Sequence, residues 1–159
     1  VDGTAMTLAE LTGRTATVFI FWSNQCPWVS KYEGRVQALQ SDFSGDGVQF
    51  VLVNANNAQA FPQESLEASR EQAASQDYEA MYVRDPNAAL AKALGASRTP
   101  HVFVFDSTNT LVYAGTIDDS PGDPGNVQKT YLRDALSALV NDQSIDVTQT
   151  RAFGCTIKF

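Results

Sequence analysis

Residues 16–29 decide the fold of this chain; they read Ala-Thr-Val-Phe-Ile-Phe-Trp-Ser-Asn-Gln-Cys-Pro-Trp-Val. The first part, 16–22, is apolar, β-branched and aromatic, which predicts a buried strand. A polar turn follows, and Pro27 opens a predicted helix to about residue 42, because proline is tolerated in a first helical turn. Cys26 therefore stands at a helix N-terminus, where unpaired N–H groups and the positive dipole end favour the thiolate. This order of elements indicates a reactive cysteine.

Apolar patterning predicts the remaining elements. Further strands are expected at 48–53, 80–83, 101–105 and 111–114, and further helices at 62–76, 86–94 and 127–140. The last two strands are separated by a tight connection, which predicts a hairpin. Alternating strands and helices predict an α/β fold with a central mixed β-sheet flanked by helices on both faces. No linker is long enough to divide the chain, so we expect one domain over 1–159, with a less regular tail at 141–159.

Three segments resemble parts of thioredoxin-like proteins. Residues 21–29, with Phe-Trp before the cysteine, resemble the active-site segment, although the second cysteine of a Cys-x-x-Cys pair is replaced by Val29. Thr99-Pro100, followed by an apolar strand, resembles the segment of the fold that carries a cis-proline. The ending Gly154-Cys155-Thr156-Ile157-Lys158-Phe159 resembles the Gly-Cys-x-Ile-Lys-aromatic terminus of a redoxin-type group with a single-cysteine Asn-x-Cys-Pro-aromatic-Val motif. That group is related to alkyl hydroperoxide reductases and thiol-specific antioxidant proteins.

The resemblance implies a thioredoxin-like fold and a thiol–disulfide oxidoreductase. In that interpretation Cys26 is the attacking thiolate and Cys155 the candidate resolving cysteine. The expected docking surface consists of Pro27, Trp28, Thr99 and Pro100, with a cis peptide bond before Pro100. The expected partners are a protein or small-molecule thiol or disulfide and an unidentified thiol reductant. No cofactor is expected.

Cys155 has three open roles. It can pair with Cys26, resolve a mixed disulfide, or be buried and inert. The tail after residue 141 is long enough to return to the site, and Gly154 gives it local freedom beside the sulfur. We therefore predict a Cys26–Cys155 disulfide, or a tail that can move to make one. Without it, an external thiol or a second molecule must resolve the mixed disulfide.

Two rival functions stay open. A thiol peroxidase would cycle Cys26 through a sulfenic acid. Ser23 fits the Ser/Thr position of the peroxiredoxin motif, but Phe19 replaces its proline and Pro100 stands where its activating arginine would be. A non-enzymatic module would instead bind a peptide on the cis-proline edge without the chemistry. The buried acid of thioredoxins is also absent, because Ile20 stands in its place.

Other polar residues have simpler interpretations. His101, the only histidine, follows Pro100 on a strand, and because strand residues alternate faces it should point away from Cys26. A metal site is therefore not expected. The spacing of Asp118, Asp119 and Asp123 matches no EF-hand loop, which favours a solvated turn. Glu64, Glu67, Arg70 and Glu71 are interpreted as a solvated helix face.

Composition narrows the partners further. The formal net charge of −7 and the pI of about 4.5 argue against nucleic acid, because phosphates would be repelled. No apolar stretch approaches the roughly 18 residues that a membrane span needs. Two cysteines do not define a compartment, so the bacterial cytoplasm and the periplasm or exterior, after signal removal, both stay open. The oligomeric state is open as well.

Overall fold

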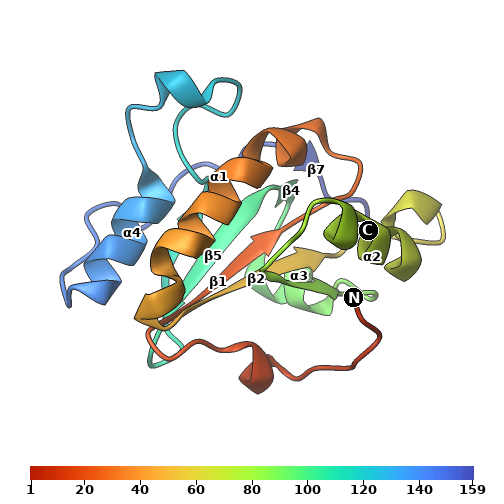
Figure 1. Ribbon diagram of the computed structural model, residues 1–159, viewed down its shortest axis with the longest axis horizontal. Coiled ribbons are helices and arrows are strands. Elements are labelled where there is room, and N and C mark those ends of the chain that lie inside the picture. The colour runs from red at the N-terminus through yellow and green to blue at the C-terminus, as the bar shows by residue number, and fades with distance from the viewer.

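A central sheet of five strands organises the protein. The computed structural model describes residues 1–159, and the strand order is β3-β2-β1-β5-β6 (Figure 1). These strands are β1 (Ala16–Phe21), β2 (Val48–Asn54), β3 (Met81–Arg84), β5 (His101–Asp106) and β6 (Leu111–Gly115). The first three run parallel, whereas β5 is antiparallel to β1 and β6 is antiparallel to β5. The sheet is therefore mixed, and β5–β6 is the predicted hairpin.

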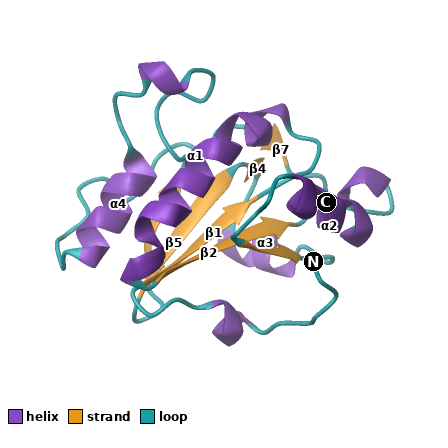
Figure 2. Ribbon diagram, in the orientation of Figure 1, coloured by secondary structure: helices purple, strands orange, loops and turns teal.

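Helices cover both faces of this sheet, as the sequence predicts (Figures 1 and 2). They are α1 (Pro27–Phe43), α2 (Leu66–Ser75), α3 (Ala89–Leu94) and α4 (Tyr131–Val140). In Figure 1, α1 and α4 lie in front of the sheet and α3 lies behind it. Short 3₁₀ turns occur at Leu8–Leu11, Ser44–Asp46, Pro62–Glu64 and Pro124–Asn126.

The core consists of two apolar clusters, one on each face of the sheet. All six residues of β1 are buried, which is expected of a central strand covered on both sides. Because strand side chains alternate, Val18 and Ile20 join the cluster under α1 and α4, whereas Phe19 and Phe21 join the cluster on the α3 side. The carboxyl end of β1 is thereby held rigidly where Cys26 follows.

Three predicted helices begin later than the sequence pattern indicates. The predicted helix at 62–76 divides at Ser65, whose hydroxyl accepts a hydrogen bond from the Ala68 N–H at 3.2 Å. The helix predicted from residue 86 begins at Ala89, because Ala88 has left-handed backbone angles (φ +51°), and the Asp85 carboxylate accepts the Ala89 and Ala91 N–H groups at 2.9 Å. Side-chain caps of this kind satisfy N–H groups that have no intrahelical partner. The last helix begins at Tyr131 rather than at residue 127.

The tail after α4 runs back across the molecule. Ala114 of β6 exchanges two main-chain hydrogen bonds with it, donating to Thr148 O at 3.1 Å and accepting from Thr150 N at 3.0 Å. The tail then ends in a short strand, β7 (Cys155–Thr156), which pairs antiparallel with β4 (Arg98–Thr99). The C-terminus is therefore attached next to the segment that leads into β5.

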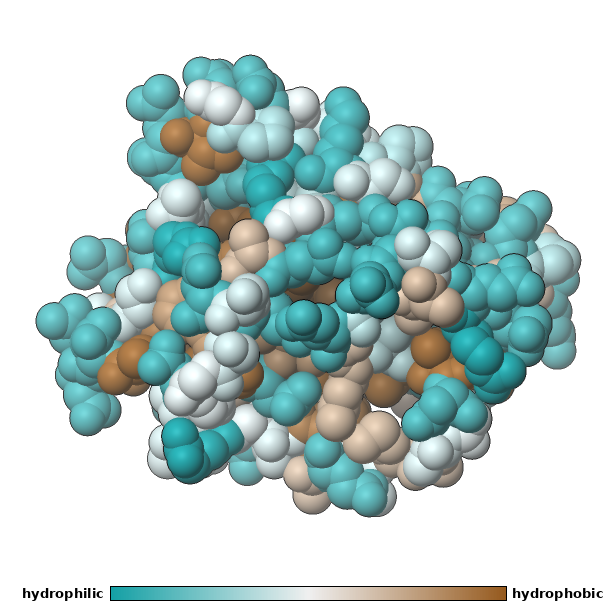
Figure 3. Space-filling view, in the orientation of Figure 1, coloured by the Kyte–Doolittle hydropathy of each residue, from teal (hydrophilic) through white to brown (hydrophobic).

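The surface is mainly hydrophilic on the face that carries α1, with small separate apolar patches (Figure 3). This agrees with the acidic composition and with a core that α1 and α4 cover. Within the whole chain, none of the helices combines the length and the apolar character needed to cross a membrane.

Candidate functional site

Cys26 lies between the carboxyl end of β1 and the first turn of α1. It is the N-cap residue, with extended backbone angles, and Pro27 occupies the first helical position. Its carbonyl accepts a hydrogen bond from the Ser30 N–H at 3.3 Å. The Cys26 side chain is only 3% exposed. The position at the helix N-terminus is the one that favours a thiolate in the reduced protein.

A disulfide joins Cys26 to Cys155, which is 129 positions further along the chain. Their Cα atoms are 6.1 Å apart, within the normal range for disulfides. The Cys26 Sγ atom also lies 3.2 Å from the Thr99 carbonyl oxygen. Of the roles that the sequence left open for Cys155, the structure places it in a pair with Cys26.

The Thr99–Pro100 peptide bond is cis and adjoins the disulfide. Both residues are buried. Thr99 is also the partner of Cys155 in the antiparallel β4–β7 ladder. Thr99 therefore lies next to both cysteines of the disulfide. The Thr99 Oγ1 atom is buried without a hydrogen-bond partner. Four of the residues singled out from the sequence, Cys26, Thr99, Pro100 and Cys155, therefore lie together.

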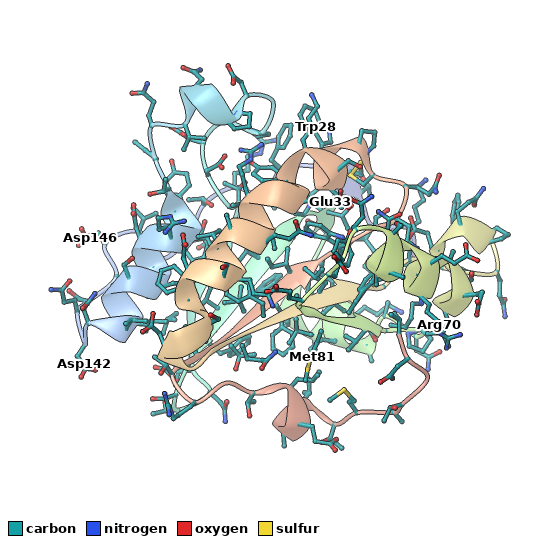
Figure 4. The ribbon with its side chains drawn as sticks, viewed as in Figure 1. Trp28, Glu33, Arg70, Met81, Asp142 and Asp146 are labelled. Atoms are coloured by element: carbon teal, nitrogen blue, oxygen red, sulfur yellow. A yellow bond between two sulfur atoms is a disulfide. The ribbon has the colours of Figure 1, made fainter.

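Trp28 and Pro27 form the outer rim of this site. The Trp28 ring packs edge-on against Phe153 of the tail, with centroids 4.7 Å apart, and the Lys31 ammonium lies 4.9 Å from the Trp28 centroid. Pro27 is exposed. Figure 4 shows Trp28 at the N-terminal end of α1, the end at which the disulfide lies. The docking residues expected from the sequence thus lie beside the disulfide, and the tail covers part of Trp28.

Gly154 permits the close approach of the tail to the cis-proline segment. Its φ is +136°, which L side chains rarely adopt, and an added Cβ would collide with the Thr99 carbonyl. A side chain at this position would therefore push the strand, and Cys155 with it, away from Cys26.

The sequence-based interpretation of Glu64 as part of a solvated helix face is wrong. Glu64 is 3% exposed and lies under the turn before Cys26. Its carboxylate accepts hydrogen bonds from Ser23 Oγ at 2.5 Å, from Asn24 N at 2.9 Å and from Asn54 Nδ2 at 2.7 Å. The backbone N–H of Gln25 donates to it at 3.3 Å. None of the ion pairs in the structure includes Glu64. Four donors therefore replace water around this buried carboxylate.

A sequence signal for this network existed. Asn54 is the last residue of the mainly apolar strand β2, Asn56 lies two positions further on, and both are fully or nearly buried. Asn56 Nδ2 donates to Asn54 Oδ1 at 3.0 Å, and Asn54 Nδ2 also donates to the Tyr82 hydroxyl at 3.1 Å. Buried amides require hydrogen-bond partners, so a nearby carboxylate was a candidate partner.

Asp118 is a second correction, because it lies in the interior rather than in a solvated turn. It is 5% exposed, accepts the Tyr32 hydroxyl at 2.9 Å and pairs with the Arg35 guanidinium at 2.7 Å. Arg35 also donates to the carbonyls of Ser120 and Pro121 at 2.9 and 2.8 Å. Burial and the neighbouring Asp118 carboxylate raise the pKa of Tyr32. This cluster ties α1 to the loop that follows β6.

His101 is buried away from the disulfide network. Its Nδ1 atom accepts the Ser97 N–H at 3.3 Å, and its ring packs on Phe103 with centroids 4.4 Å apart. Burial lowers the pKa of His101 to about 4. The imidazole is therefore neutral at physiological pH and acts as a structural acceptor.

The mixed sheet, the cysteine that caps the N-terminus of α1 and the cis-proline before β5 define a thioredoxin-like fold. The chain belongs to the redoxin family, because the family model described as Redoxin matches residues 1–131. A search of the curated proteins finds no match.

Solved structures extend this comparison. A hypothetical protein from Sinorhizobium meliloti is 36% identical, with a TM-score of 0.91 over 99% of this chain and 87% of the other. An uncharacterized conserved protein from Geobacillus kaustophilus is 33% identical, with a TM-score of 0.93 over 100% and 85%. A secreted disulfide oxidoreductase from Mycobacterium tuberculosis, homologous to DsbE, shares the fold at 14% identity, with a TM-score of 0.61 over 89% and 90%.

Proposed function

We propose that the protein is a thiol–disulfide oxidoreductase in which Cys26 is the attacking cysteine and Cys155 resolves the mixed disulfide. The observation that carries this proposal is the Cys26–Cys155 disulfide at the start of α1, beside the cis-proline. Membership of the redoxin family supports it. The disulfide oxidoreductase of the same fold from Mycobacterium tuberculosis gives the activity a precedent.

The reaction begins with both cysteines reduced. The Cys26 thiolate attacks one sulfur of a substrate disulfide, so a mixed disulfide forms and the other substrate sulfur leaves as a thiolate that takes up a proton. The Cys155 thiolate then attacks Cys26 Sγ. The Cys26–Cys155 disulfide forms, the second substrate sulfur leaves, and two electrons have passed to the substrate. A thiol reductant must restore the dithiol by the same exchange in reverse.

Cys155 takes the role that the second cysteine of a Cys-x-x-Cys pair would have. Val29 occupies that second position and is 1% exposed. The resolving sulfur therefore comes from the tail rather than from α1. This arrangement lets the resolving group leave the site together with its strand, which a cysteine fixed in the helix cannot do.

A single-turnover assay tests the proposal. Reduced protein is mixed with glutathione disulfide, and intact mass and free thiols are followed with time. We expect one Cys26–Cys155 disulfide and two glutathione thiols per chain, and little reaction for Cys26→Ser. If hydrogen peroxide is consumed catalytically while glutathione disulfide is not reduced, the thiol peroxidase replaces this proposal. If neither reacts, the chain is a binding module.

A further inference from the structure

The tail strand β7 lies along the edge of β4 beside the disulfide, in the way that an extended peptide would bind there. β7 pairs with β4 in the register Arg98 with Thr156 and Thr99 with Cys155. Beyond this pair, the Ile157 N–H donates to Ser97 O at 3.1 Å. Addition of a strand to an exposed edge is a common way to bind a peptide, because main-chain hydrogen bonds supply affinity and alternate side chains supply specificity.

A second backbone segment holds the other side of the tail. The Asn57 N–H donates to Lys158 O at 2.6 Å, and the Lys158 N–H donates to Asn56 Oδ1 at 3.0 Å. The tail therefore lies between the β4 segment and the loop after β2. These hydrogen bonds hold the tail in addition to the disulfide; the surface that makes them, formed by Ser97, Thr99, Asn56 and Asn57, is called the seat below.

The side chains of the tail alternate between contact and solvent. Ile157 is 3% exposed and belongs to the apolar cluster that also contains Ala55, Ala91 and Ala96. Its neighbours Thr156 and Lys158 are exposed. Because even a Cβ at position 154 would collide with the Thr99 carbonyl, the seat favours glycine before the cysteine, and the burial of Ile157 favours an aliphatic residue two positions after it.

We infer that the chain's own tail occupies the expected docking surface in the place of a substrate strand, and that the tail sequence therefore shows which substrate this seat prefers. Its substrate is an extended protein segment with glycine immediately before a disulfide-bonded cysteine and a branched aliphatic residue two positions after it. This inference rests on the proposed oxidoreductase function. A substrate strand in this register would present its cysteine sulfur where the Cys155 sulfur now lies, bonded to Cys26.

Because the substrate strand and the tail would use the same seat, formation of the Cys26–Cys155 disulfide would be coupled to release of the reduced substrate. The substrate strand and the tail cannot both pair with Thr99. When the Cys155 thiolate attacks Cys26 Sγ, the tail must regain the seat, and the reduced substrate segment leaves as the Cys26–Cys155 disulfide forms. Because the tail is tethered, its effective concentration favours this displacement over rebinding of the product.

Synthetic peptides that copy the tail test the inference directly. The probe has the sequence of residues 151–159 with its cysteine linked by a disulfide to thionitrobenzoate. Attack by Cys26 on the peptide sulfur releases the coloured thiolate. The enzyme is the reduced full-length Cys155→Ser variant, which stops at the mixed disulfide. Matched peptides carry aspartate in place of the isoleucine, or alanine in place of the glycine.

We expect the parent peptide to react about tenfold faster than either matched peptide, because burying a carboxylate or displacing the Thr99 carbonyl weakens docking. Equal rates for the three peptides, together with normal reaction of glutathione disulfide, would overturn the inference and leave the proposed function standing. Failure to react with any disulfide would reject the proposed function itself.

A variant of the protein gives an independent test, because one substitution should raise one reaction rate and lower another. Ile157→Asp should loosen the tail, so the reduced variant should react with the parent peptide several-fold faster and form its own Cys26–Cys155 disulfide several-fold more slowly. Phe159→Asp is the matched control, because that side chain is 55% exposed. The control should change neither rate. If Ile157→Asp slows both reactions or leaves both unchanged, the tail does not compete for the substrate seat.

Discussion

The Glu64 carboxylate and the Ser23 hydroxyl, 41 residues apart in the chain, form a 2.5 Å hydrogen bond beneath the turn that presents Cys26. Together with the N–H groups of Asn24 and Gln25, this bond makes Glu64 the main side-chain support of the turn. None of the hydrogen bonds of Glu64 involves a cysteine sulfur, so its expected role is to position Cys26.

Replacing Glu64 by glutamine tests this role. The amide can accept at only one of its two terminal atoms, so some of the four donors around it lose their partner. We expect Glu64→Gln to lower the free energy of unfolding by about 2–4 kcal/mol, measured by urea denaturation. The rate of disulfide exchange should also fall. Glu67→Gln, on an exposed side chain, should change stability by less than about 0.5 kcal/mol. Equal stability of the two variants would contradict the account.

The Arg35–Asp118 ion pair should matter more than the Arg133–Asp42 pair. The Arg35 and Asp118 side chains are 16% and 6% exposed, against 41% and 52% for the other pair. Removing one partner of a buried pair leaves an uncompensated charge, so Arg35→Met should lower the free energy of unfolding by about 3–5 kcal/mol. Arg133→Met should cost about 0–1 kcal/mol. Urea denaturation of both variants checks the contrast, which similar losses would refute.

His101 should make stability depend on pH in a defined window. Its pKa is about 4 in the folded protein and 6.5 in the unfolded chain. As the pH falls, the unfolded chain therefore takes up the proton before the folded protein does. The contribution of neutral His101 to the free energy of unfolding is present above about pH 6.5 and is lost as the pH falls through about 4. The loss should be on the order of 3 kcal/mol. Urea midpoints measured across the window should fall for the parent and stay flatter for His101→Gln. Parallel profiles would show that His101 is not the titrating group.

The reduced cysteines should differ in reactivity. Cys26 is the N-cap residue of α1, whereas Cys155 lies in a two-residue strand without a helix dipole. We expect the Cys26 pKa to lie below the ordinary cysteine value of about 8.5, and Cys26 to be alkylated faster at neutral pH. Iodoacetamide rates against pH, resolved for each cysteine by peptide mass spectrometry, give both values. A Cys26 titration at or above the ordinary value would remove the electrostatic support for its role.

The sequence is most informative where local chemistry decides the structure. The strand over residues 16–21 and the helix from Pro27 follow from continuous apolar residues and from a proline that suits a first helical turn. The position of Cys26 therefore follows as well. The return of the tail is predictable from its length, but its register is not, because two-residue strands such as β7 carry no periodicity.

The wrong predictions for Glu64 and Asp118 have the same cause, because both acids are buried by residues that are distant in the sequence. The sequence pattern indicates solvated side chains for Glu64 and Asp118, because charged residues are rarely buried without partners. Their partners come from distant segments, such as Ser23 and Asn54 for one and Tyr32 and Arg35 for the other. The amides of Asn54 and Asn56 indicate that a polar partner is needed, but no local pattern around Glu64 or Asp118 identifies these acids as buried, because the contacts exist only after the strands have assembled.

The roles of the two cysteines are distinguished by the species that is trapped when each one is replaced. Reduced Cys155→Ser and reduced Cys26→Ser are mixed with glutathione disulfide, and intact mass and peptide mapping identify any adduct. We expect a persistent mixed disulfide on Cys26 in the first variant and little adduct on Cys155 in the second. A persistent adduct on Cys155, with none on Cys26, would contradict the assignment of attacking and resolving cysteines.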